Sequence, residues 1–164
     1  MSVIDELVDA NTHFADALGG VESPALPPRR RVAIVTCMDA RIVPARIFGL
    51  EEGDAHVIRN AGGLAREALR SLVISQRLLG TSAIAVVHHT DCGMLTFQNE
   101  DVREKVQQDL GADASDIDFM PFAELDQSVR DDVAFLRDSP LIAPDTEIRG
   151  FVYDVSSRRV NELA

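Results

Sequence analysis

Residues 86–94 read Val-Val-His-His-Thr-Asp-Cys-Gly-Met, in which β-branched apolar residues are followed by His89 and Cys92. An earlier stretch, residues 34–41, has the same layout: Ile-Val-Thr-Cys-Met-Asp-Ala-Arg places Cys37 at the end of an apolar run. The two stretches hold the only two cysteines of the chain. Continuous rather than alternating apolar runs are typical of strands that are covered on both faces of a parallel sheet. The two stretches therefore predict two buried strands whose ends carry thiol and imidazole groups.

The length of 164 residues fits one domain, and we expect residues 1–164 to form it, with residues 1–28 as an N-terminal arm and linker. There are 27 acidic and 16 basic side chains, which gives a formal net charge of −11. A polyanion would be repelled by such a chain, so the composition argues against nucleic-acid binding and against docking on anionic membranes.

The N-terminus has no basic segment followed by a long apolar stretch, so we expect no secretion signal, no membrane span and a cytoplasmic location. In that setting two cysteines serve more often as reduced ligands or catalysts than as a disulfide.

Apolar runs alternate with segments of helical periodicity along the chain. This alternation predicts an α/β fold with a mostly parallel central sheet of four to five strands, flanked by helices and preceded by an N-terminal helical arm. The expected strands are residues 31–37, 55–60, 83–89 and 148–155, with a short edge strand at 158–163. The expected helices are residues 2–18, 42–50, 65–79, 100–110 and 122–138.

Two details of these helices can be read from the residues. Ser2 and Asp5 resemble a capping box at the start of helix 2–18, which is either an ordinary surface helix or an arm that packs on a partner subunit. Apolar residues surround most of helix 65–79, so we expect it to be well buried. His13 and His56 are expected to be surface histidines.

Ligands of open α/β sheets bind beyond the carboxyl ends of the strands, where the strand order reverses. If strands 31–37 and 83–89 are neighbours, Cys37, His89 and Cys92 converge on one crevice. Thiolate and imidazole ligands in this number suit zinc, and three protein ligands leave the fourth tetrahedral position open, as in catalytic sites. His88 points to the opposite face of its strand and is expected to be packed or hydrogen-bonded.

An open zinc site lowers the pKa of bound water to about 7. Asp39 can reach the same crevice, where it could accept a hydrogen bond from the zinc-bound hydroxide, or bind zinc itself and close the site. Arg41 can hold Asp39 ionised in a bidentate pair. The alternative is that the two residues form only a structural ion pair.

These residues resemble the β-class carbonic anhydrases, in particular the compact bacterial members. That family carries Cys-x-Asp-x-Arg after the first strand and His-x-x-Cys after the third, which stand here at residues 37–41 and 89–92. Residues 59–63, Arg-Asn-Ala-Gly-Gly, are similar to the turn between these motifs. Two features depart from the pattern: Ala40 replaces the more common serine, and no tryptophan is present for the bicarbonate-inhibition pocket of some members.

The resemblance implies reversible hydration of carbon dioxide to bicarbonate and a proton by a zinc-bound hydroxide. It also implies Cys37, His89 and Cys92 as zinc ligands and Asp39 with Arg41 as the catalytic pair. A homodimer with the helical arm reaching across is implied too, and pairing of dimers into a tetramer is left open.

Three other functions fit parts of the pattern. A related zinc hydrolase could act on carbon disulfide or carbonyl sulfide. A zinc-stabilised binding or regulatory protein would use Asp39 as a permanent fourth ligand. A thiol redox protein would join Cys37 to Cys92, although the chain has no Cys-x-x-Cys motif.

Overall fold

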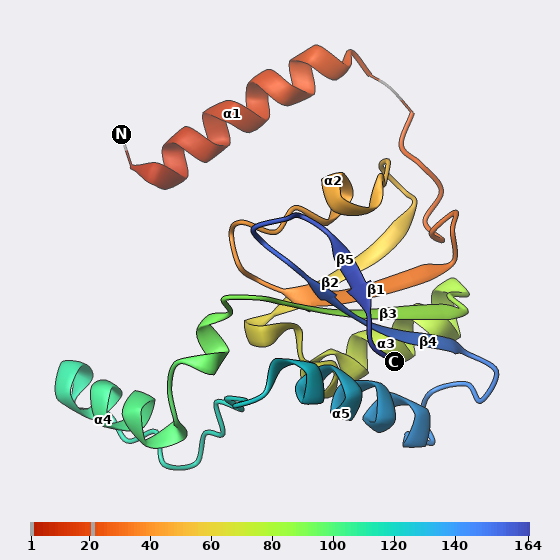
Figure 1. Ribbon diagram of the computed structural model, residues 1–164. Coiled ribbons are helices and arrows are strands. Elements are labelled where there is room, and N and C mark those ends of the chain that lie inside the picture. Colours follow the sequence, from red (N-terminus) through yellow and green to blue (C-terminus); the bar gives the residue numbers. More distant parts are fainter. Residues whose placement is uncertain (1, 21) are drawn as a thin grey trace.

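Five strands form a single sheet in the order β2-β1-β3-β4-β5 in the computed structural model, which describes residues 2–20 and 22–164 (Figure 1). The first four strands are parallel, and β5 runs antiparallel to β4. The expected α/β fold with a mostly parallel sheet is therefore confirmed. The strands are β1 (Val32–Cys37), β2 (Ala55–Asn60), β3 (Ala83–His89), β4 (Glu147–Tyr153) and β5 (Val160–Glu162).

The helices lie close to the ranges that the sequence predicts. They are α1 (Val3–Leu18), α2 (Pro44–Phe48), α3 (Ala65–Leu79), α4 (Asn99–Leu110) and α5 (Leu125–Asp138). Helix α5 begins three residues later than expected, because Phe122 packs into the core in a non-helical segment. Strand β4 ends earlier than expected, because the carboxylate of Asp154 accepts hydrogen bonds from the next turn.

Both faces of the sheet are covered, which explains why the central strands are apolar without alternation. On one face, α3 and α5 pack against alternate residues of β1 and β3 (Figure 1). On the other face, α2 and the segments that follow β1 and β3 form a second apolar cluster, which includes Cys37 and Cys92.

The order of the strands reverses at β1. The chain passes from β1 to β2 on one side and then crosses to β3 on the other side, so β1 and β3 are neighbours with their carboxyl ends at the same edge. Cys37 is the last residue of β1 and His89 is the last residue of β3. The prediction that these two strands are neighbours is confirmed. Cys37 and His89 therefore lie at the switch point of the sheet, where ligands of such sheets bind.

Helix α1 stands apart from the sheet and from the other helices (Figure 1). Its start has the expected capping box, in which Ser2 and Asp5 each accept the other's backbone N–H. None of its residues is buried, and its exposed apolar side chains are Val3, Ile4, Leu7, Val8, Phe14 and Leu18. The predicted N-terminal helix is thus present, and the division at residue 28 stays a prediction; residues 1 and 21 of that range lie outside the described residues. That the arm packs on a partner subunit stays a prediction.

Two expectations about burial are wrong. The side chain of Leu78 is 76% exposed and Ile74 is also exposed, because α3 contacts the sheet along only one face. His56 is half-buried rather than a surface residue, and its Nδ1 lies 2.7 Å from Oγ of Ser75, which in turn hydrogen-bonds Thr81. Within residues 2–20 and 22–164, no helix has the length and apolar character needed to cross a membrane.

Candidate metal centre

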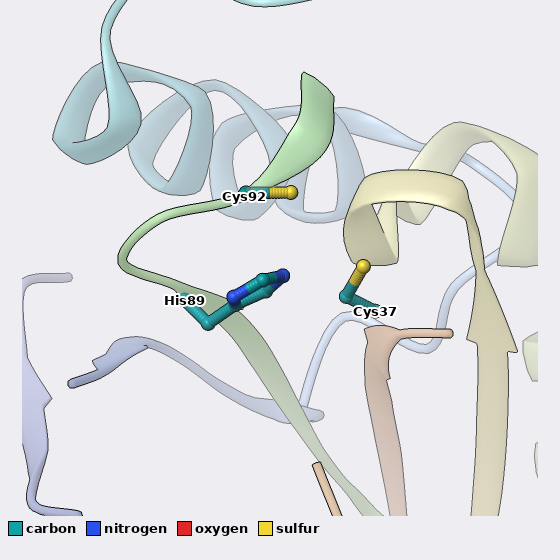
Figure 2. Close-up of side chains that lie close together, drawn as sticks. All are labelled: Cys37, His89 and Cys92. Carbon is teal, nitrogen blue, oxygen red and sulfur yellow. The ribbon is translucent and has the colours of Figure 1, made fainter. Parts of the chain in front are cut away.

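Three soft donor atoms meet at the carboxyl end of the sheet. The sulfur atoms of Cys37 and Cys92 and a ring nitrogen of His89 all lie within 4.8 Å of one another, and all three side chains are buried (Figure 2). Cys37 comes from the end of β1, His89 from the end of β3, and Cys92 from the turn that follows β3. The structure thus brings together the three residues that the sequence singles out.

The orientation of His89 is fixed by its own turn. Its Nδ1 lies 2.9 Å from the carbonyl oxygen of Thr90, which can only accept, so Nδ1 carries a proton and, in the neutral ring, Nε2 has the free lone pair. Nε2 is buried and has no hydrogen-bond partner among the described residues. A buried polar atom without a partner is costly, and a cation at the cluster would satisfy it.

The two thiols also favour a cation. A hydrogen bond from the Cys92 thiol, opposed by burial and assisted by His89, lowers the pKa of Cys37 to about 4. The hydrogen bond with Cys37, together with burial, raises the pKa of Cys92. One proton is therefore shared between the two sulfurs when no cation is present, whereas a bound metal ion would allow both to be thiolates.

Asp39 lies beside the cluster but is not one of the three grouped donors. Its Oδ2 is 3.9 Å from Nε2 of His89. Two hydrogen bonds from the Arg41 guanidinium hold the carboxylate, at 3.0 Å from Nε to Oδ1 and 2.7 Å from Nη2 to Oδ2. These bonds keep the pKa of Asp39 well below its usual range. The predicted pairing of Asp39 with Arg41 is therefore present in the structure.

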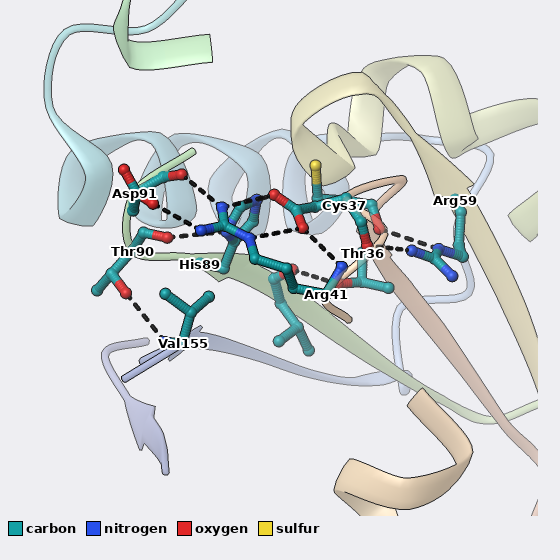
Figure 3. Close-up of polar contacts among 10 residues, drawn as sticks. Thr36, Cys37, Arg41, Arg59, His89, Thr90, Asp91 and Val155 are labelled. Carbon is teal, nitrogen blue, oxygen red and sulfur yellow. Dashed lines mark hydrogen bonds and ion pairs between the residues drawn. The ribbon is translucent and has the colours of Figure 1, made fainter. Parts of the chain in front are cut away.

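Other residues hold this arrangement in place (Figure 3). Arg59 donates to the carbonyl oxygens of Cys37, at 3.0 Å, and of Asp39, at 2.7 Å, and so braces the backbone of the segment after β1. Arg41 also donates to the side chain and the carbonyl oxygen of Asp91, in the turn between His89 and Cys92. The sequence pattern alone indicates no role for Arg59 or Asp91, although both stand inside the motifs at residues 59–63 and 89–92.

The backbone approaches Cys37 closely at the turn after β2. A Cβ atom on Gly63 would lie 2.7 Å from the backbone nitrogen of Cys37 and 2.7 Å from the carbonyl carbon of Thr36. The backbone N–H of Gly62 helps to lower the pKa of Cys37, and a Cβ added to Gly62 would lie 3.1 Å from side-chain atoms of Met94 and Phe122. The two glycines allow this turn to pack against the end of β1, and they confirm the expected turn near the site.

His88 faces away from the cluster, as expected, into a buried polar network between β3 and α5. Its Nδ1 lies 2.8 Å from Oγ of Ser128, and its Nε2 lies 3.1 Å from Oδ2 of Asp132. The same Asp132 oxygen accepts the backbone N–H of Ala65, at the start of α3, at 2.9 Å. The ring of His88 stacks on Phe122. This network ties both helices to the strand that ends in His89.

A cavity of about 470 Å³ lies next to the Asp39–Arg41 pair. Arg41 forms part of its wall, and the remaining lining residues come from α2 and from the end of β4 and the turn after it. Its lining residues are Arg41, Val43, Arg46, Ile47, Tyr153, Val155 and Arg158.

Comparison with known proteins gives a consistent result. The family model described as carbonic anhydrase matches residues 32–160. The chain is 40% identical to β-carbonic anhydrase 1 of Mycobacterium tuberculosis, over 99% of this chain and 99% of that protein. It is 32% identical to a carbon disulfide hydrolase of Acidianus, over 98% of this chain and 90% of that protein. The crystal structure of a carbonic anhydrase from Streptococcus mutans superposes with a TM-score of 0.94 at 50% identity, covering 100% of this chain and 99% of that one.

Proposed function

The chain belongs to the β-carbonic anhydrase family, and from this premise we propose that it catalyses the reversible hydration of carbon dioxide to bicarbonate and a proton, with zinc held by Cys37, His89 and Cys92. The proposal rests on the cluster of two sulfurs and one imidazole nitrogen at the switch point of the sheet, a nitrogen that has no hydrogen-bond partner within residues 2–20 and 22–164.

The donor set fits zinc better than other common metal ions. Thiolate and imidazole together suit zinc, whereas magnesium and calcium require oxygen ligands. Three protein donors leave one tetrahedral position open, as in catalytic rather than structural sites. A zinc ion bound there supplies a water molecule whose pKa is about 7, and so a nucleophile at neutral pH.

Asp39 orients the reacting water in this proposal. Because Arg41 keeps its pKa low, the Asp39 carboxylate is ionised at neutral pH and accepts a hydrogen bond without retaining the proton. It therefore aligns the water rather than acting as a general base. Arg41 holds the carboxylate by two guanidinium bonds, which would keep it beside the three donors without making it a fourth ligand.

The surroundings suit a small apolar substrate and an anionic product. Met94 and Phe122 pack against Gly62 beside Cys37, and this apolar wall excludes water and favours carbon dioxide. The neighbouring cavity is lined by both apolar side chains and arginines. Arg46 and Arg158 line the cavity, and their charge favours the approach of bicarbonate in a chain with a net charge of −11.

A second candidate is the hydrolysis of carbon disulfide, because the chain is also similar to the Acidianus hydrolase of that substrate. Carbon disulfide is linear and apolar like carbon dioxide but larger, so the same donors could serve both. The greater identity to β-carbonic anhydrase 1 favours carbon dioxide.

We also propose a homodimer, because α1 carries an exposed apolar face that no part of its own described chain covers. In this proposal residues 1–164 act as one domain with residues 1–28 as its arm. We place the protein in the cytoplasm, because its two ligand cysteines are free thiols and a reducing compartment keeps them so.

The test is a stopped-flow assay of carbon dioxide hydration with zinc quantified in the same sample. The proposal predicts one bound zinc per chain, activity that is lost with a chelator, and activity that returns with zinc. Carbon disulfide is assayed in parallel. Bound zinc without hydration would contradict the proposal, and turnover of carbon disulfide alone would favour the second candidate.

A further inference from the structure

Asp91 lies in the turn between His89 and Cys92 and has a backbone φ of 55°, in the left-handed region. The turn is anchored on one side by Thr90, whose N–H donates to the carbonyl oxygen of Tyr153 at 3.0 Å and whose hydroxyl accepts the N–H of Val155 at 3.0 Å. The Asp91 side chain is 77% exposed, so packing does not explain its position.

The contacts of Asp91 lead to Arg41. Nη1 of Arg41 donates to Oδ2 of Asp91 at 2.6 Å, and Nη2 donates to the carbonyl oxygen of Asp91 at 2.9 Å (Figure 3). The other edge of the same guanidinium holds Asp39 by two bonds. One planar group therefore joins the segment after β1 to the turn after β3. Among the described residues, Arg41 is the only cation within ion-pair distance of Asp91.

We propose that Asp91 is a positioning residue that acts through Arg41. By fixing the guanidinium, Asp91 sets the orientation of Asp39. It also ties the turn that carries His89 and Cys92 to the segment that carries Cys37. This inference rests on the proposed function, since it concerns the same site. It adds a role for Asp91, which is neither one of the three metal donors nor part of the Asp39–Arg41 pair.

Loss of the Asp91 carboxylate should affect the reaction rate more than the folding stability. An ion pair between exposed groups adds little to folding stability, so Asp91 is not expected to matter much for unfolding. Its effect is on alignment, where a misplacement of 1 Å can cost about 100-fold in rate. When the Asp91 carboxylate is removed, the Arg41 guanidinium keeps its two bonds to Asp39 and the Arg41 backbone N–H keeps a third, so we expect a smaller loss.

The variant Asp91→Asn tests this directly. Asparagine tolerates a positive φ, and its backbone oxygen can still accept from Arg41, so the variant removes the charge with little strain. The experiment compares wild type, Asp91→Asn, Arg41→Gln and the double variant as zinc-loaded full-length proteins. The control is Asp109→Asn, which breaks a similarly exposed ion pair with Lys105 on α4.

Two quantities are measured: kcat and KM for carbon dioxide hydration, and the rate of zinc transfer to excess chelator. We expect Asp91→Asn to lower kcat/KM about tenfold, mainly through kcat, and to speed zinc transfer severalfold. In the Arg41→Gln background the same change should alter each quantity less than about twofold, because the two residues act as one unit. Asp109→Asn should match wild type.

A wild-type result for Asp91→Asn in both measurements would overturn the inference, and so would an equal effect in both backgrounds. The rate of zinc transfer still tests the coupling between Asp91 and Arg41 if the Arg41→Gln proteins hydrate carbon dioxide too slowly to assay. A wild-type protein that binds zinc without hydrating carbon dioxide would contradict the proposed function, whereas the zinc-transfer comparison would still test the role of Asp91.

Discussion

Replacement of Gly63 by alanine should damage both the fold and the metal centre. Gly63 has a φ of +76°, a conformation that costs an alanine about 1–2 kcal/mol. Its new Cβ would also lie 2.7 Å from backbone atoms of Thr36 and Cys37, in a central strand between β2 and β3 that cannot move aside. Overpacking of this kind costs about 1–3 kcal/mol more. Gly80 is a matched control, because it has a φ of +71° but a Cβ added there would meet no atom within 4 Å.

Urea unfolding at one fixed chain concentration, with zinc content measured on the same samples, gives the comparison. Gly80→Ala should lose only about 1–2 kcal/mol and keep its zinc, because the left-handed strain is its only cost. Gly63→Ala should lose roughly 2–5 kcal/mol and bind less zinc, because the clash displaces Cys37. Equal unfolding midpoints for the two variants, with full zinc in both, would show that the close approach of Gly63 to β1 adds no cost beyond the positive φ.

Three further predictions concern the site and its support. Asp39→Asn and Arg41→Ala should keep zinc but lower kcat/KM about 100-fold, since each removes the alignment of the reacting water; full activity in both would exclude the catalytic pair. Asp132→Ala should lower the free energy of unfolding, measured by urea titration, by about 3 kcal/mol, because it leaves the buried partners His88 and the Ala65 N–H unsatisfied. The control Asp131→Ala, at an exposed neighbouring position, should change it by no more than about 0.5 kcal/mol. Similar losses in the two variants would contradict the role of the His88–Asp132 network. Hydrogen bonds from Arg41 lower the folded pKa of Asp39, and hydrogen bonds from the Glu51 backbone and Arg29 lower that of Asp54. These two carboxylates should therefore contribute fully to the stability of the metal-free protein above their unfolded pKa of about 3.9, and that contribution should be lost as the pH falls through their lower folded pKa values. A urea midpoint that stays constant far below a pH of about 3.9 would contradict this.

The sequence was sufficient to predict the elements that position the site. Strands 55–60 and 83–89 and helix 65–79 have the expected bounds, because their apolar runs end at glycine or polar residues. The three donors could be predicted for the same reason: Cys37 and His89 end their strands, and neighbouring parallel strands end at one edge.

Other features depend on contacts between elements that are distant in the sequence. The exposure of Leu78 follows from which side of α3 faces the sheet, and the burial of His56 follows from its contact with Ser75 on that helix. The pairing of Arg41 with Asp91 spans fifty residues, and a charged residue in a short turn gives no indication of its partner. Such contacts depend on how elements that are distant in the sequence pack together, which the apolar pattern of each element does not show.

The most direct test of the metal centre is X-ray absorption spectroscopy at the zinc edge on the purified wild-type protein. Our account predicts a first shell of two sulfur atoms at about 2.3 Å and two lighter atoms at about 2.0–2.1 Å, one from His89 and one from solvent. Cys37→Ser or Cys92→Ser should each remove one sulfur from that shell. A shell without sulfur, or no bound zinc in protein purified under reducing conditions, would contradict the account.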